Sequence, residues 1–324
     1  MYSNALRLVL AAVAALASLC APFAVADAFP TRPVMVFSPF APGSTDAILR
    51  PFVEKMGEFL GQPVVLNFKP GAGGAIGAGF VAGSKPDGYT LVGTSIGSVV
   101  LGPLADKDSK FTLDSFTPVV AFAEGNLMLI VPANSPHRTL KDLVEYSRKH
   151  PDTVTYGSSG SMGITHLLTE MLAKDAGVRW THIPYQGSGP AITSLLGDHV
   201  QMASTSAGSA QAHLKSGTLR ALAVYSDVRM KAYPEVPTLS ELGFRVSSPV
   251  VYGLLAPRGT PREIVDALHG AVRKVVAKYG DTFAANLAFS GAEIKLMNPE
   301  EYGAYLKAQE ALYMATIRNL NAGK

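Results

Sequence analysis

Short runs of β-branched and apolar residues alternate along the chain with longer segments whose apolar residues recur at helical spacing. Near the N-terminus, apolar runs at 34–40, 64–68 and 90–95 are separated by helical patterns at 47–61 and 78–86. Such alternation is typical of a mostly parallel sheet with helices on its faces. This part of the chain therefore predicts an α/β unit.

The same alternation returns in the middle of the chain. Apolar runs at 153–159, 179–187 and 219–226 flank helical patterns at 164–177 and 190–200. A second α/β unit is therefore expected.

Two extended segments link these units. The strand-like segment 116–132 is interrupted at Gly125 and Asn126, and the Pro-rich segment 233–244 leads into the apolar run 250–257. This layout predicts two α/β lobes joined by a hinge of two crossovers, with a cleft between them. We assign residues 27–127 and 246–324 to the first lobe and 128–245 to the second.

The last part of the chain, from Thr260, has a helical pattern. Apolar residues recur at helical spacing over 261–280 and 298–320, and Asn298 and Pro299 suit the cap and first position of a helix. We expect these helices to cover the first lobe.

Residues 1–26 have the pattern of a secretory signal peptide. Arg7 precedes an apolar run, and Ala24 and Ala26 form a small-residue cleavage site before Asp27. The run is shorter than the roughly 20 residues of a membrane span. A cleaved leader is therefore favoured over an uncleaved anchor.

Composition excludes several classes of function. Cys20 is the single cysteine and lies in the leader, so the mature chain has no thiolate for catalysis or for a zinc site. The formal charge is only +3, and no basic cluster resembles a nucleic-acid footprint. No nucleic-acid partner is expected.

The segment 39–46, PFAPGSTD, joins a strand end to the start of a helix. Its hydroxyls and its carboxylate suit helix capping. A strand end, a glycine loop and a helix N-terminus also suit an anion site, because free N–H groups and the helix dipole point the same way. Both interpretations stand at this point.

The segment 93–97, GTSIG, matches the G-x-S-x-G pattern in which Ser95 would be a nucleophile. Gly102 and Pro103 follow too closely for a supporting helix of ordinary length, and no His-Gly-Gly segment precedes it. A cleft loop with polar tips is favoured, and a secreted serine hydrolase using Ser95 is the alternative.

The segment 70–82 contains Gly77, Gly79 and Ala82 in a loose G-x-G-x-x-A pattern. It follows the second strand, and no acid stands about 20 residues on, as a dinucleotide fingerprint requires. A turn followed by a helix packed close to the sheet is favoured, and no cofactor is expected.

The segment 157–168, GSSGSMGITHLL, again joins a strand end to a helix. Seen alone it is a capped helix, but with 39–46 it would make a second anion cradle facing the first. His166 and His182 have no partners at metal-ligand spacing, so neither a metal site nor acid–base catalysis is expected.

Eight segments of the chain together resemble the Bug/TctC family, the periplasmic substrate-binding receptors of tripartite tricarboxylate transporters. The resemblance covers essentially the whole mature chain in the family's order. The segments are FPTRPVMVFSPFAPGSTD, GQPVVLNFKPGAGGAIGA, KPDGYTLVGT, VTYGSSGSMGITHL, HIPYQGSGPAITSLLGDHV, LKSGTLRALAVYSDVR, PEVPTLSELGF and GLLAPRGTP.

The resemblance implies a type II periplasmic-binding fold that closes over a carboxylate, partly through bound waters. It implies that both cradles grip the ligand and that the 94–95 position is a binding position, whereas Asp46 is expected to cap the helix and order the loop. The candidate ligand-binding residues are Phe40, Ala41, Gly43, Ser44, Thr45, Asp46, Thr94, Ser95, Ser158, Ser159, Gly160, Ser161, Met162, Gly163, Tyr185, Thr205 and Ser206. Tyr185 and Tyr252 are as compatible with packing as with ligand contact.

The chain departs from the family where many relatives carry an Asp-Asn pair. Here the sequence is Ala203-Ser204-Thr205-Ser206. A buried ammonium group needs a compensating negative charge, so the pocket suits plain aliphatic or aromatic carboxylates better than amino acids.

The family resemblance implies a monomeric periplasmic receptor, not an enzyme, that delivers an organic carboxylate to a membrane permease. A carboxylate sensor that signals through a partner is the remaining alternative. The sequence does not select the carboxylate.

Overall fold

The computed structural model of the protein describes residues 29–42, 44–106, 108–247, 249–289 and 291–322. The predicted leader lies outside these ranges, as does Gly43 of the candidate site.

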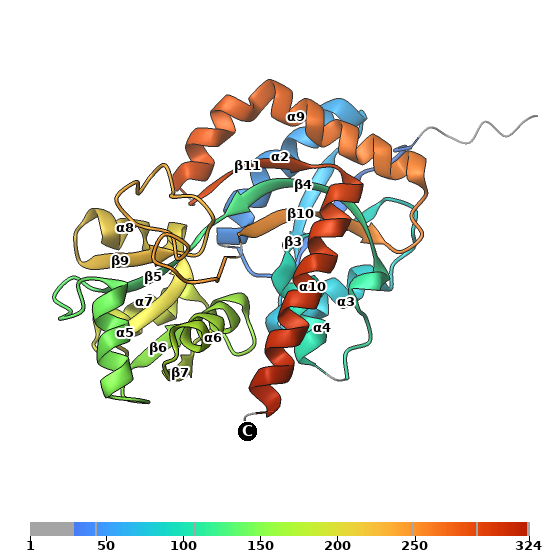
Figure 1. Ribbon diagram of the computed structural model, residues 1–324. Coiled ribbons are helices and arrows are strands. Elements are labelled where there is room, and N and C mark those ends of the chain that lie inside the picture. Colours follow the sequence, from blue (N-terminus) through green and yellow to red (C-terminus); the bar gives the residue numbers. More distant parts are fainter. Residues whose placement is uncertain (1–28, 43, 107, 248, 290, 323–324) are drawn as a thin grey trace, which may run out of the picture.

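The first sheet has six strands in the order β11-β4-β10-β3-β1-β2 (Figure 1). Their bounds are β1 (Val34–Ser38), β2 (Val64–Phe68), β3 (Thr90–Ser95), β4 (Phe116–Gly125), β10 (Val250–Pro257) and β11 (Ala292–Met297).

Helices cover both faces of this sheet. Helices α2 and α9 pack on each other and on one face, whereas α10 runs along the other face and reaches the second lobe at α6 (Figure 1). The helical elements are α2 (Ser44–Leu60), η1 (Ala72–Gly74), α3 (Ala75–Ala82), η2 (Gly97–Leu101), α4 (Gly102–Ala105), η3 (Leu113–Ser115), α9 (Arg262–Phe289) and α10 (Pro299–Ala322).

The second sheet has five strands in the order β7-β6-β8-β5-β9. The elements of this lobe are β5 (Leu127–Pro132), α5 (Leu140–Lys149), β6 (Thr155–Ser158), α6 (Ile164–Ala176), β7 (Thr181–Pro184), α7 (Ser188–Leu196), β8 (Met202–Ser206), α8 (Ala207–Lys215) and β9 (Leu219–Val224). The two-lobed α/β architecture predicted from the sequence is confirmed.

Strand direction is more mixed than the mostly parallel sheets predicted from the sequence. The pairs β1/β2, β1/β3, β6/β7 and β6/β8 are parallel, but β10 runs antiparallel to β3 and β4, and β5 runs antiparallel to β8 and β9. The antiparallel strands β5 and β10 are the ones that enter a lobe from the other lobe, so their direction is set by the crossover.

The first crossover passes through Asn126, between β4 and β5. The Asn126 N–H donates to the carbonyl of Gly291 at 3.1 Å, and the Asn126 carbonyl accepts from the N–H of Ala207 at 3.0 Å. The second crossover joins β9 to β10. The residue bounds assigned to the lobes above stay a prediction.

An aromatic cluster ties three elements of the first lobe together. The ring of Phe52 on α2 stacks on Phe122 of β4 at 4.4 Å and meets Phe283 of α9 edge-on at 5.2 Å. All three are buried, and aromatic contacts of this geometry add to the free energy gained by removing the rings from water. This cluster holds α2, and the loop before it, against the sheet.

The C-terminal helices are confirmed, with one strand that the helical pattern did not predict. Asn298 and Glu301 form a capping box at the start of α10, with both hydrogen bonds at 2.9 Å. The unpredicted strand is β11, an edge strand that pairs with β4. Most residues of β11 are exposed or half-buried, so buried and exposed positions do not alternate regularly along it. Its strand conformation therefore depends on the pairing with β4.

No helix in the described part of the chain is both long and apolar enough to cross a membrane.

We expect Gly253→Ala to destabilise the protein, because β10 is packed closely on both sides. A Cβ atom at Gly253 would lie 2.3 Å from the carbonyl oxygen of Val120 and 2.9 Å from the ring of Tyr302. The expected loss in free energy of unfolding is about 3 kcal/mol, as for other overpacked cores.

The matched control is Gly270→Ala on α9, where no atom lies within 4 Å of the new methyl group. That variant should be stabilised by about 0.5–1 kcal/mol through helix propensity. Urea unfolding measures both values, and equal effects of the two substitutions would contradict the prediction.

Candidate functional site

Three loops that follow β1, β2 and β3 meet at the ring of Phe40. A Cβ atom on Gly74, whose φ is +98°, would lie 3.2 Å from this ring, and one on Gly97 would lie 3.9 Å from it. Glycine at position 74 therefore lets the backbone of the loop after β2 approach the aromatic ring, whereas a methyl group at position 97 would make an ordinary contact with it. Because ligands of α/β folds bind at the carboxyl ends of strands, these loops form the first half of the candidate site.

The loop after β1 is fixed at its start by Ser38. This buried hydroxyl accepts the N–H of Phe40 at 3.4 Å and donates to the Phe40 carbonyl at 3.3 Å. Ala41 is exposed and Thr45 is half-buried, so both lie close to solvent. The side chain of Ser44 lies outside the described part, although Ser44 begins α2.

Asp46 lies in the first turn of α2 and forms a salt bridge with Arg50, one turn further on, at 2.7 Å. A carboxylate in this turn complements the positive end of the helix dipole. The salt bridge with Arg50 gives Asp46 a role in ordering the start of the helix. This role does not require contact between Asp46 and a ligand.

Thr94 and Ser95 end β3, but only one of them lies near the surface. Thr94 is fully buried, and its hydroxyl shares a 2.8 Å hydrogen bond with Ser98. Ser95 is 9% exposed and is the neighbour of Tyr252 in the β3/β10 pairing.

The sequence predicts no helix of ordinary length after Ser95, and the structure has two short helical elements there. A π-helical turn, η2, begins at Gly97 and continues directly into α4, in spite of Gly102 and Pro103. Pro103 lies in the first turn of α4, where its missing N–H costs little. π-Helical turns are frequent at functional sites, in keeping with a binding role for this loop.

The second half of the candidate site is the loop between β6 and α6. Ser158 is fully buried, Ser159 and Gly160 are half-buried, and Ser161 is exposed. The hydroxyl of Thr165 on α6 accepts the N–H of Ser159 at 3.0 Å and shares a 2.8 Å hydrogen bond with its hydroxyl. The side chains of Ser158 and Ser159 thus bond within the protein, and the loop's exposed groups are those around Ser161.

The N-terminus of α6 carries no side-chain cap. Its N-cap is Gly163 in an extended conformation, whereas α5 begins with a full capping box at Thr139. The first-turn N–H groups of an uncapped helix need acceptors, and the helix dipole makes this end attractive to an anion. Helix α7, which follows β7, also begins at a glycine, Gly187, without a side-chain cap.

The remaining candidate residues, Tyr185, Thr205 and Ser206, are buried or are hydrogen-bonded within the protein. The hydroxyl of Tyr185 is hydrogen-bonded to Ser194 on α7, which favours packing over ligand contact. Ser206 caps α8 by accepting the N–H of Ser209 at 3.4 Å. Thr205 is fully buried, and its hydroxyl has no hydrogen-bond partner within the described residues.

Strand register places candidates from both lobes beside the first crossover. Ser95 pairs with Tyr252, whose ring packs against Gly125. Leu127, two residues further, pairs with Ser206. The candidate residues of the two lobes therefore flank the Gly125–Leu127 connection from opposite sides.

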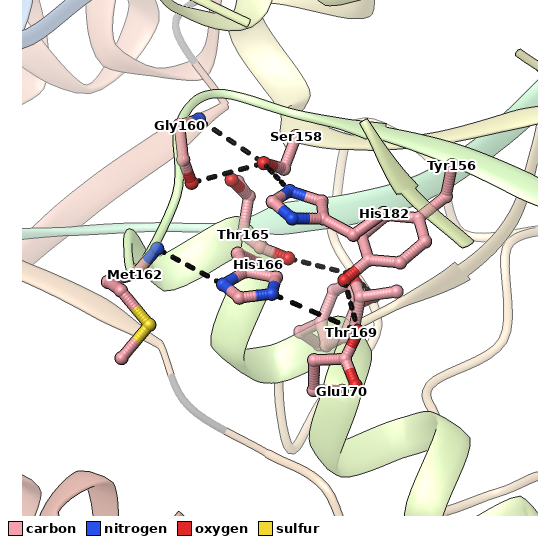
Figure 2. A network of polar contacts seen from close by, with 10 residues as sticks. Tyr156, Ser158, Gly160, Met162, Thr165, His166, Thr169, Glu170 and His182 are labelled. Carbon is pink, nitrogen blue, oxygen red and sulfur yellow. Dashed lines mark hydrogen bonds and ion pairs between the residues drawn. The ribbon is translucent and has the colours of Figure 1, made fainter. Parts of the chain in front are cut away.

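Beneath the second loop lies a polar network that the sequence did not predict (Figure 2). The rings of His166 and His182 are stacked 3.8 Å apart, and Tyr156 donates to Glu170 at 2.6 Å. His182 also lies 2.7 Å from the hydroxyl of Ser158. The contact between the two histidines depends on how α6 packs against β7 and not on their spacing in the sequence.

The Ser158–His182 distance is short enough for a nucleophile and its base, but the surroundings do not suit hydrolysis. Ser158 is fully buried, and the neighbour of His182 is a second imidazole instead of an orienting carboxylate. Burial lowers the pKa of His182 to about 4 and raises the pKa of Glu170. At neutral pH, His182 is therefore a neutral hydrogen-bonding group.

A cavity of about 710 Å³ lies elsewhere. It is bounded by the C-terminal half of α6, by Trp180, by Arg245 and Val246 of the second crossover, and by Thr316 on α10. None of the candidate ligand-binding residues lines it. Among the described residues, no three His, Cys, Asp or Glu side chains gather to hold a metal ion.

Two α/β lobes joined by two crossovers, with loops from both lobes beside the connection, define a receptor of the two-lobed binding-protein class. The model of the TctC family, tripartite tricarboxylate transporter family receptor, matches residues 48–322. The chain belongs to this family.

Curated relatives match over nearly their full length. A UPF0065 protein of Cupriavidus necator, encoded in the gbd 5' region, is 35% identical over 302 residues, which are 93% of this chain and 91% of the relative. Protein BugT of Bordetella pertussis is 32% identical over 95% of both chains.

Solved structures show the same fold. The periplasmic binding protein BugD is 31% identical, with a TM-score of 0.77 over 90% of this chain and 98% of its own. MatC of Rhodopseudomonas palustris, solved with malate, is 27% identical, with a TM-score of 0.78 over 89% of this chain and 100% of its own. An R. palustris protein solved with adipate is 30% identical, with a TM-score of 0.79 over 90% and 97%.

We expect His182 to make stability fall as the pH falls from about 6.5, the ordinary pKa of histidine, towards the pKa of about 4 that burial gives it in the folded state. In this range the unfolded chain binds a proton that the folded protein does not, so protonation favours unfolding. Stability from this source is complete above about pH 6.5.

His182→Gln removes this titration and keeps an amide near the same position. Urea unfolding of both proteins at pH 7.5, 6.0 and 4.5 tests the prediction. The unfolding free energy of the natural protein should fall more between pH 7.5 and 4.5 than that of the variant. A difference between the two proteins that does not change with pH would contradict the prediction.

Proposed function

We propose that the protein binds an organic carboxylate between the loop after β1 and the loop between β6 and α6. The observation that carries the proposal is the uncapped N-terminus of α6 at Gly163. Its N–H groups and the helix dipole supply hydrogen bonds and positive potential for an anion.

Relatives support the same class of ligand. MatC was solved with malate, and a second relative was solved with adipate. Both of these ligands carry a carboxylate at each end. A dicarboxylate offers one group to each lobe, so its contacts stabilise the closed arrangement over the open one.

The residues around Thr205 favour plain carboxylates over amino acids. The segment 203–206 carries no acid, and Asp46, the one carboxylate among the candidate residues, is paired with Arg50. A buried ammonium group would have no compensating charge. The ligand class is therefore a mono- or dicarboxylate, aliphatic or aromatic.

In this role the protein is a monomeric receptor without catalytic activity. It is exported to the periplasm by a cleaved leader and hands the carboxylate to the permease of a tripartite tricarboxylate transporter. Family membership supports the receptor class and the permease. A sensor that signals through a partner would use the same binding site.

We expect a carboxylate to raise the melting temperature in a dose-dependent way, because a ligand that binds only the folded state stabilises it by mass action. A suitable panel contains malate, succinate, adipate, citrate, benzoate and glutamate, with the matching alcohols or amides as controls. At 100 times Kd the stabilisation is about 2.7 kcal/mol. A folded protein that responds to no carboxylate, or equally to the amides, would refute the proposal.

We expect Gly163→Asp to weaken carboxylate binding while stabilising the free protein. An aspartate at the N-cap of α6 would accept the first-turn N–H groups, adding about 0.3 kcal/mol of stability because glycine is already a tolerated N-cap, and would repel an anion there. The expected loss of affinity is about tenfold or more, or at least about 1.4 kcal/mol.

Gly163→Asn is the control, because it has the same shape and capping ability without the charge. In both variants the Cβ atom lies 3.3 Å from the Gly160 carbonyl oxygen, so any steric effect is shared. Calorimetry should give a clearly weaker affinity for the aspartate variant. Equal affinities would place the carboxylate away from α6.

A further inference from the structure

The loop between β6 and α6 is held from beneath by two ring nitrogens (Figure 2). His166 Nδ1 accepts the N–H of Met162 at 3.1 Å. His182 Nε2 lies 2.7 Å from the hydroxyl of Ser158, and that hydroxyl accepts the N–H of Gly160 at 3.2 Å. Each imidazole therefore fixes a different part of the same loop.

The hydrogen bonds determine the state of His166. A backbone N–H can only donate, so Nδ1 must carry a lone pair, and the ring proton of a neutral imidazole is then on Nε2. Nε2 lies 3.9 Å from Glu170, one turn further along α6, and Glu170 in turn accepts the hydroxyl of Tyr156 at 2.6 Å. The carboxylate thus faces the protonated side of the ring.

Stacking holds the two rings in register. The ring of His182 contacts two neighbours, His166 at 3.8 Å and 15° and Tyr156 at 4.9 Å. Tyr156 and His182 are direct neighbours in the parallel β6/β7 pairing. The sheet therefore fixes His182, and His182 supports His166.

The loop needs this support because its backbone is unusual. Met162 has a φ of +57° and Gly160 a φ of +149°. A residue other than glycine rarely adopts a positive φ and persists there only when its surroundings hold it. The N–H groups of these two residues are the ones that the two networks fix.

We propose that His166 and His182 are positioning residues for ligand binding, with the δ nitrogen of His166 and the ε nitrogen of His182 holding the loop in its binding conformation. The proposal rests on the proposed function of this loop. Neither ring needs to touch the ligand.

Asparagine and glutamine substitutions test this assignment. The amide of asparagine lies near the δ nitrogen of a histidine, and the amide of glutamine lies near its ε nitrogen. His166→Asn keeps an acceptor at the δ position, and His182→Gln keeps a polar group at the ε position. His166→Gln and His182→Asn exchange these positions. All four variants carry a neutral amide, so each pair isolates the place of one atom.

Affinity for malate and adipate, measured by calorimetry at pH 7.5, is the first readout. We expect His166→Asn and His182→Gln to bind within about threefold of the natural protein, and the exchanged variants to lose about tenfold, since one net hydrogen bond is lost. Equal affinities in all four variants, whether high or low, would overturn the proposal.

Amide hydrogen exchange of Met162 and Gly160 is the second readout and needs no ligand. Exchange at Met162 should be about tenfold faster in His166→Gln than in His166→Asn, and exchange at Gly160 faster in His182→Asn than in His182→Gln. If the natural protein binds no carboxylate but this exchange pattern holds, the proposed function fails and the loop assignment stands. Binding with unchanged exchange overturns the assignment alone.

Discussion

The structure depends on the antiparallel pairing of β10 with β3 and β4. All of β10 is buried, and its Gly253 lets the carbonyl of Val120 and the ring of Tyr302 approach closely. Because β10 returns from the second lobe and β4 leads into it, the same pairing fixes both crossovers. It also sets Ser95 beside Tyr252, and Tyr252 beside Gly125. The position of each candidate loop relative to the hinge follows from this pairing.

The candidate site uses neutral donors in place of charged side chains. Its one carboxylate, Asp46, is paired within α2, and the start of α6 has a glycine at its N-cap. Helix α5, by contrast, carries a capping box at its N-terminus. N–H groups and a helix dipole bind an anion without the desolvation penalty of a buried charge.

The second loop owes its shape to groups that lie below it. Imidazoles provide a ring nitrogen at a fixed place and a flat surface for stacking, and both properties are used by His166 and His182. Burial lowers the pKa of His182 and keeps its ring uncharged, so it adds no repulsion to its neighbour. The loop is thereby hydrogen-bonded on one side and exposed at Ser161 on the other.

The sequence by itself determined the α/β class, the two lobes and the strand–helix positions of both loops, because apolar periodicity and turn residues are local signals. The family followed from the resemblance of eight segments spread along the chain. The sequence did not determine β11, whose strand character comes from pairing with β4, or the helical turn after Ser95. Only the tertiary structure showed that Ser158 and Thr94 turn inward and that Tyr185 bonds to Ser194. It also brought together His166 and His182, which are sixteen positions apart in the sequence. Contacts of that kind depend on strand register and helix packing, which no short segment of sequence contains.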